Sequence, residues 1–349
     1  MEAVDRIWEV SPGTAKITAS TTDGSGVSGS MSISVNTFHR ETRLNNWMIG
    51  STHVNNLVQG LAVGGTYCYS FEVSATATPG INDGSVADEE HALYRYSTSL
   101  QPKMTIKSPY SRPRLGHAND ATLASYTSGG VNSLLMYVAA YNRNGTGVVI
   151  GQENVITKLE YNSSGEYYEK AIFTYPTSVW RIGGVSRKSG GGTDSHHVLL
   201  LKSDRNFYEV SVPANASGTT SLPTLPSNYF SILYAYGTED YSNYTAQSFH
   251  YEPVNGGTIY VPMWGGGVGK PNENVILVYH GIDNTTTKNI KATERYFIKN
   301  TNKPNGVFEI EAIGFRGNTL WFSTNEATIP DDVYARENGG IYTDSQNIK

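Results

Sequence analysis

The stretch NDATLASYTSGGVNSLLMYVAAY, residues 119–141, contains the pattern that decides the fold. A polar entry, Asn119 and Asp120, leads into a partly apolar run, a glycine-containing turn at 128–130 and a strongly apolar second run. Two such runs joined by a short turn predict a β-hairpin. The same sequence pattern recurs four times along the chain, at 59–73, 183–203, 247–264 and 311–325.

The copies are nearly evenly spaced. Aligning their second strands brings these residues into register, at separations of 70, 62, 61 and 61: Tyr67, Tyr137, Leu199, Tyr260 and Trp321. Third-strand segments are expected at 91–97, 154–162, 206–213, 274–281 and 331–337, and further strand-like segments at 103–110, 167–175 and 292–300. Repeats of three or four strands are typical of propeller blades. We therefore predict an all-β, five-bladed β-propeller, with a long β-sandwich of similar hairpins as the alternative.

Composition agrees with many short strands. The 349 residues include 36 glycines and 24 tyrosines but only 16% charged residues, whereas helices favour Ala, Leu, Glu and Lys. A net charge of −5 gives no electrostatic reason to bind nucleic acid or an anionic membrane. No apolar run is long enough to insert into a membrane. The first ten residues do not resemble a signal peptide. The single cysteine, Cys68, excludes an intramolecular disulfide and is expected to be buried.

The N-terminal region differs from the repeats. Two alternating runs, 15–21 and 30–35, flank DGSG at 23–26 and predict a hairpin. This hairpin resembles the last one of a bacterial Ig-like domain. We therefore assign 1–40 to the C-terminal part of such a domain and 41–349 to the propeller. The segment NNWMIG, 45–50, is expected to supply the outer strand of the last blade and close the ring.

The first strand of each blade should line a central channel, so the five strand entries should converge at one mouth. The equivalent positions are Gln59, Asp120, Gly184, Gln247 and Glu311. Four of the five carry polar side chains. They predict either a ligand site or a plug of groups that hydrogen-bond one another and trapped water.

Three further residues complete the candidate ligand site. His117 and Asn119 are expected to shape the rim of the mouth. Trp264 precedes the glycine-rich segment GGGVGK, 265–270, and is the predicted aromatic contact. Aromatic rings beside amides and acids are suited to sugars. No cofactor is expected. The oxygen-bearing side chains at the mouth are of the type that binds calcium, so a structural calcium ion is an open alternative.

Several motifs carry a resemblance to a known family. GHANDATL, 116–123, is followed by YVA, 137–139; AQSFHYE, 246–252, by TIYVPMW; and FEIEAIGF, 308–315, by LWFSTNE. Over roughly 50–345 the chain resembles the helveticin J-like family, secreted bacterial proteins named for a large bacteriocin and predicted to form propellers. The resemblance implies an extracellular or surface protein that recognises or acts on bacterial cell surfaces.

Three functions follow as hypotheses. The first is a binding module for a cell-wall or cell-surface glycan. The second is a polysaccharide-cleaving glycosidase that uses Asp120 and Glu311, since glycosidases need two carboxylates. The third is a structural interaction domain of a phage tail or adhesin. No P-loop, dinucleotide fingerprint or G-x-S-x-G elbow is present. His196 and His197 are adjacent in a strand and face opposite sides, which disfavours a shared metal ion.

Overall fold

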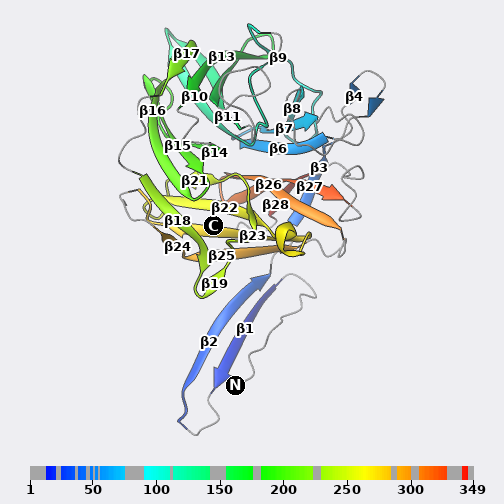
Figure 1. Cartoon of the computed structure of the whole chain (residues 1–349), viewed down its shortest axis with the longest axis vertical. Helices are drawn as coiled ribbons and strands as arrows, with labels where there is room; N and C mark the ends of the chain where they lie inside the picture. Colours follow the sequence, from blue (N-terminus) through cyan, green and yellow to red (C-terminus); the bar gives the residue numbers. More distant parts are fainter. Residues whose placement is uncertain are drawn as a thin grey trace.

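The computed structural model describes fourteen segments of the chain: 13–20, 25–35, 38–44, 48–49, 52–53, 56–74, 90–110, 113–141, 155–175, 182–222, 229–283, 289–299, 306–327 and 340–344. Five small antiparallel sheets are arranged as a five-bladed β-propeller, as predicted (Figure 1). Within the described segments the one helical element is the short 3-10 helix η1 (Gly265–Val268). No helix in those segments is long and apolar enough to cross a membrane.

The blades follow one another along the chain. Blade 1 contains β6 (Asn56–Val63), β7 (Cys68–Ser74) and β8 (Glu90–Tyr96). Blade 2 contains β10 (Asp120–Ser128), β11 (Val131–Ala140), β12 (Val155–Tyr161) and β13 (Tyr167–Thr174). Blade 3 contains β14 (Gly184–Ser189), β15 (His196–Ser203), β16 (Asn206–Pro213), β18 (Tyr229–Tyr236) and β19 (Glu239–Asp240). Blade 4 contains β20 (Thr245–Ala246), β21 (His250–Glu252), β22 (Thr258–Trp264), β23 (Glu273–His280) and β25 (Glu294–Lys299).

Blade 5 joins the two ends of the propeller. Its strands β26 (Val307–Arg316), β27 (Thr319–Ala327) and β28 (Gly340–Asp344) are completed by β3 (Phe38–Arg43), which precedes blade 1 in the chain. The prediction that 45–50 would close the ring is therefore wrong. β4 (Met48–Ile49) pairs with β5 (Thr52–His53) instead. The expected third strand at 331–337 lies outside the described residues, and β28 occupies the third position.

Three short strands add to the outer edges of blades, and each pairs in parallel with the outer strand of its blade. β17 (Gly218–Ser221), which follows the third strand of blade 3, pairs with β13 of blade 2. β24 (Ile290–Ala292), from the chain of blade 4, pairs with β18 of blade 3. β9 (Ile106–Lys107), which lies in the strand-like segment predicted after blade 1, also pairs with β13. The additions cover edges that would otherwise expose unpaired backbone groups.

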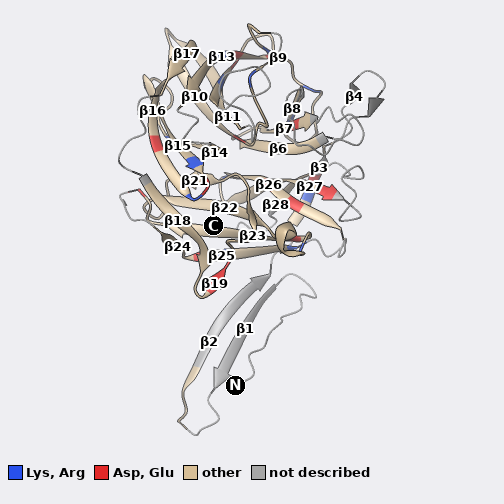
Figure 2. Ribbon diagram, in the orientation of Figure 1, with Lys and Arg blue, Asp and Glu red and all other residues tan. Residues whose placement is uncertain are grey.

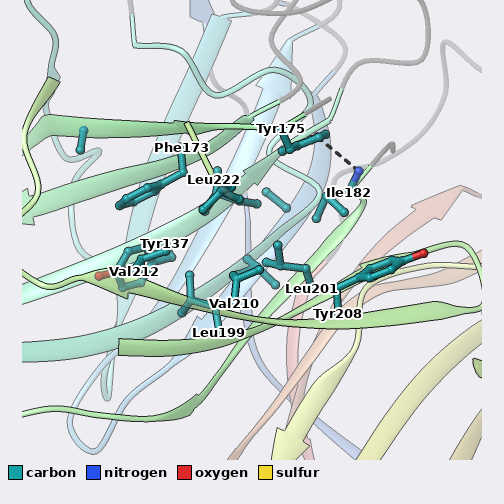
Figure 3. Close-up of a cluster of buried hydrophobic side chains, with 14 of the residues drawn as sticks. Tyr137, Phe173, Tyr175, Ile182, Leu199, Leu201, Tyr208, Val210, Val212 and Leu222 are labelled. Carbon is teal, nitrogen blue, oxygen red and sulfur yellow. Dashed lines mark hydrogen bonds between the residues drawn. The ribbon is translucent and has the colours of Figure 1, made fainter. Parts of the chain in front are cut away.

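The hydrophobic core is divided among the interfaces between blades. One cluster between blades 2 and 3 contains Tyr137, Phe173, Leu199 and Leu201, and Figure 3 shows their side chains packed between the two sheets. Similar clusters fill the other interfaces. A blade cannot bury both faces alone, so closing the ring completes the core. Figure 2 shows acidic and basic positions scattered singly along the described strands.

Four of the five residues aligned from the sequence lie on second strands, and Tyr67 lies one residue before β7. The predicted N-terminal hairpin is also formed. β1 (Gly13–Ser20) and β2 (Ser28–Val35) pair with each other and extend away from the blades (Figure 1). Cys68 is buried, and burial raises the pKa of its thiol to about 12.

Candidate functional site: a polar ring at the entry mouth

We call the end of the channel at which the first strands of the blades begin the entry mouth. One buried carboxylate, that of Asp120, links several blades there. Asp120 begins β10 and is only 1% exposed. Its Oδ1 accepts the Ala121 N–H at 2.9 Å, and its Oδ2 accepts N–H groups from Val185 at 3.1 Å and Phe249 at 3.3 Å. One side chain of blade 2 thereby holds the entries of blades 3 and 4.

Lys202 supplies the positive charge beside this carboxylate. It is the last residue but one of β15, is 4% exposed, and its Nζ donates to the Gln247 carbonyl at 2.6 Å. Burial lowers the pKa of Lys202 to about 8, and the nearby Asp120 opposes that shift. Burial raises the pKa of Asp120 well above its ordinary value, while the three N–H donors and Lys202 oppose the rise. The two charges therefore compensate each other in a site where either alone would be costly.

The other side of the entry mouth is held by amides and carboxylates of blades 5 and 1. Asn325, on β27, accepts the Val58 N–H at 2.8 Å and donates to the Val58 carbonyl at 3.2 Å. Its Nδ2 also donates to Glu311. The Gln247 side chain donates to Glu309 Oε1 at 2.6 Å, which links blades 4 and 5.

The ring is completed by contacts between backbones. Gly60 N–H donates to the Ala118 carbonyl at 2.8 Å, and Ser248 N–H donates to the Glu311 carbonyl at 3.3 Å. A Cβ at Gly60 would lie 2.6 Å from the Ala118 oxygen, and one at Gly184 would lie 2.7 Å from the Phe249 ring. Hydrogen bonds therefore connect every neighbouring pair of blades at this level. Gly184, the one entry without a polar side chain, allows close packing there.

The predicted site residues differ in exposure. Gln59, Asp120 and Glu311 are buried, and their backbone or side-chain groups bind neighbouring blades. His117, Asn119 and Gln247 are partly exposed, although the Gln247 side chain already donates to Glu309. The Asn119 Oδ1 atom is buried and has no hydrogen-bond partner among the described residues.

Trp264 contacts the segment that follows it in the chain. Its indole N–H donates to the Pro271 carbonyl at 2.8 Å, and its ring packs against Gly266 in η1. These side-chain contacts are thus with the glycine-rich segment 265–270 and with the proline that follows it. The residue is half-buried and fixes that loop against blade 4.

Sequence reasoning missed Lys202, Asn325 and Glu309. Each lies near the end of a strand, at the edge of an apolar run. A polar residue at such a position is ordinarily exposed to solvent. A signal was present in the alignment, because Lys202 and Asn325 follow the aligned positions Leu199 and Trp321 by three and four residues. No three His, Cys, Asp or Glu side chains in the described segments form a group that could hold a metal ion.

Comparison with known proteins supports the architecture. No protein-family model matches the chain, and no curated protein matches it. Among solved structures, it is similar to a glycoside hydrolase of the GH130 family of mannoside phosphorylases, which targets β-1,2 mannosidic linkages in Candida mannan. The TM-score is 0.51 at 8% identity, covering 88% of this chain and 93% of the other. This similarity supports the propeller fold.

Two further structures are similar at lower scores. A levansucrase variant from Bacillus subtilis has a TM-score of 0.44 at 8% identity, covering 83% of this chain and 85% of its own. A fucose-specific lectin from Aleuria aurantia has a TM-score of 0.35 at 12% identity, covering 94% of this chain and 89% of its own.

Proposed function

We propose that the protein is an extracellular or surface glycan-recognition propeller that binds a cell-wall or cell-surface glycan at the entry mouth. The observation that carries the proposal is the difference in exposure among the residues of the mouth. Asp120 and Glu311 are buried and engaged in hydrogen bonds, while His117 and Asn119 are partly exposed. Amide and imidazole groups of this kind can donate to and accept from sugar hydroxyls. The helveticin J-like resemblance and the fold shared with a mannoside-acting hydrolase support a glycan as the partner.

Binding is favoured over cleavage by the state of the carboxylates. A glycosidase needs one carboxyl group that protonates the leaving oxygen and a second that attacks or activates water. Both Asp120 oxygens accept backbone N–H groups from within the ring, and Asn325 donates to Glu311 Oε1. Proton transfer from Asp120 would require breaking contacts that hold blades together, and proton transfer from Glu311 would compete with its contact to Asn325.

The test is binding of purified bacterial cell walls and soluble oligosaccharides, measured by co-sedimentation and calorimetry. We expect Asn119→Ala and His117→Ala to weaken binding about tenfold or more, because each removes the polar side chain of a partly exposed residue at the mouth. The matched control is Asn132→Ala, since Asn132 is an exposed residue near the opposite end of β11.

Three outcomes decide among the functions. Loss of binding in the mouth variants alone supports the proposal. Release of reducing sugar by the wild-type protein, abolished in Asp120→Asn and in Glu311→Gln, would instead establish the hydrolase. Absence of any glycan binding, together with capture of a phage-tail or adhesin protein, would favour the structural interaction domain.

A further inference from the structure

A cluster of four tyrosines joins blades 1 and 2 at the end of the propeller opposite the entry mouth. We call this end the hairpin face, because the first strand of each blade turns back there into the second. The tyrosine cluster consists of Tyr67, Tyr69, Tyr161 and Tyr167. Tyr69 and Tyr167 meet edge to face across the interface, at a centroid distance of 5.8 Å, and both are buried. Tyr67 lies beside the first at 6.2 Å and Tyr161 beside the second at 5.2 Å, and both of these are partly exposed.

Arg95 lies on the same side of blade 1 as this cluster, since the strand register pairs it with Tyr69. The centre of its guanidinium group lies 4.8 Å from the centre of the Tyr67 ring, and its Nη1 donates to the Tyr161 hydroxyl at 3.3 Å. Burial raises the pKa of the Tyr69 and Tyr167 hydroxyls, and the positive charge of Arg95 opposes the rise. The charge of one arginine therefore acts on all four tyrosines.

The guanidinium group of Arg95 forms no ion pair with a carboxylate of the described segments. It has five N–H donors, and only one, on Nη1, has an acceptor there. Nε is buried and has no hydrogen-bond partner in those segments. Nη2 also has none, but it is not buried, so a ligand can reach it from solvent. A positive charge that is partly removed from water and lacks a counter-ion is costly, and an anion bound at Nη2 would offset that cost.

We propose that Arg95 and the tyrosine cluster form a second ligand site, which binds a sugar acid, that is, a saccharide residue that carries a carboxylate. The carboxylate would accept hydrogen bonds from the free N–H groups of Nη1 and Nη2, since the planar fork of a guanidinium group matches two carboxylate oxygens. The C–H face of the sugar would pack on the partly exposed ring of Tyr67 or Tyr161. A neutral sugar would leave the guanidinium charge unmatched. The site goes beyond the proposed function, because it lies at the opposite end of the propeller from the entry mouth.

The experiment measures the binding of a galacturonic acid tetramer and of its methyl ester by calorimetry at neutral pH. Esterification removes the negative charge and keeps the sugar ring. We expect the wild-type protein to bind the acid at least about tenfold more tightly than the ester, with affinity falling as salt is added. Arg95→Gln should abolish this preference. Arg95→Lys keeps the charge but not the planar fork, and should retain a reduced preference.

Arg295→Gln is the matched control. Arg295 also lies on aromatic rings, 4.9 Å from the centre of Tyr236 and 4.6 Å from that of Phe297, but it already forms an ion pair with Glu239. This variant should keep the wild-type preference for the acid. Thermal unfolding of each variant establishes that the blades remain folded under the conditions of the binding measurement.

Equal binding of acid and ester, no binding of either, or a preference that survives in folded Arg95→Gln would overturn the second site. Stronger competition by inorganic phosphate than by galacturonate would assign the anion to a phosphate group and overturn the sugar acid. Acid binding that is lost in Asn119→Ala but retained in Arg95→Gln would overturn this inference and leave the proposed function standing. Acid binding that is lost in Arg95→Gln but retained in Asn119→Ala supports the second site, whatever the outcome at the entry mouth.

Discussion

Asp120 shows how much one residue contributes at the centre of the ring. Three backbone N–H groups from three blades donate to its two oxygens, and Lys202 offsets its charge. A buried N–H group that loses its acceptor still carries the full free-energy cost of its removal from water. The same residue type at a strand start is ordinarily a turn former, so its importance here comes from where the strand lies.

Asp120→Ala is expected to lower the free energy of unfolding by about 3 kcal/mol, because it orphans buried N–H groups and leaves Lys202 without its compensating charge. Denaturant unfolding measures the change. Glycan binding, corrected for the folded fraction, should be nearly intact. Unchanged stability with lost binding would show instead that Asp120 is a ligand residue.

Glu72, in the second strand of blade 1, predicts a pH dependence. Both its oxygens lack hydrogen-bond partners among the described residues, and burial raises its pKa from 4.5 to about 7. Between these values the unfolded chain releases a proton that the folded protein keeps. Stability therefore falls as pH rises through this window, by roughly 3 kcal/mol in total.

Glu72→Gln should remove that contribution. We expect the difference in unfolding free energy between variant and wild type to grow in favour of the variant from pH 5 to pH 7.5. Other groups, including Asp120, are common to both proteins and cancel in the comparison. A difference that stays constant with pH would contradict the assignment.

At the level of elements, the first strands approach one another too closely for ordinary side chains. Gly60 in β6 lies against the backbone of Ala118, while Gly184 in β14 lies against Phe249. A glycine in a strand interior weakens that strand, so its presence commonly marks such an approach. These positions set the distance between neighbouring blades at the entry mouth.

Gly60→Ala should destabilise the protein by about 1–3 kcal/mol, since the added methyl group meets a backbone oxygen that cannot rotate away. Gly65→Ala is the matched control, because nothing lies within 4 Å of its Cβ position in the adjoining turn. Thermal unfolding of the two variants measures the contrast. Equal effects at both positions would argue against the close contact.

The whole molecule is a ring closed by a strand from the other end of the chain. β3 pairs with β28, and Glu41 of β3 accepts hydrogen bonds from Tyr96 of blade 1 at 2.9 Å and Thr343 of blade 5 at 2.6 Å. Leu44, immediately after β3, is fully buried between the same blades. The segment therefore seals the last interface as well as the last sheet.

Two truncations test this closure. Removing residues 1–37 deletes the hairpin and should leave the melting temperature little changed. Removing residues 1–44 also deletes β3 and should cost several kcal/mol, since loss of a buried leucine alone costs roughly 2–5 kcal/mol. Differential scanning calorimetry distinguishes the two proteins. Similar melting of both would contradict closure by β3.

The five hairpins, the repeat that aligns Tyr137 with Tyr260 and the placement of Asp120 at a channel mouth follow from the sequence. They depend on local alternation, turn chemistry and even spacing, which neighbouring residues encode. The tertiary structure alone decided that β3 rather than 45–50 closes the ring, and that Lys202 and Asn325 enter the mouth. The physical reason is that these contacts join segments far apart in the chain. A lysine near the end of an apolar strand looks the same in sequence whether it meets solvent or a buried carboxylate.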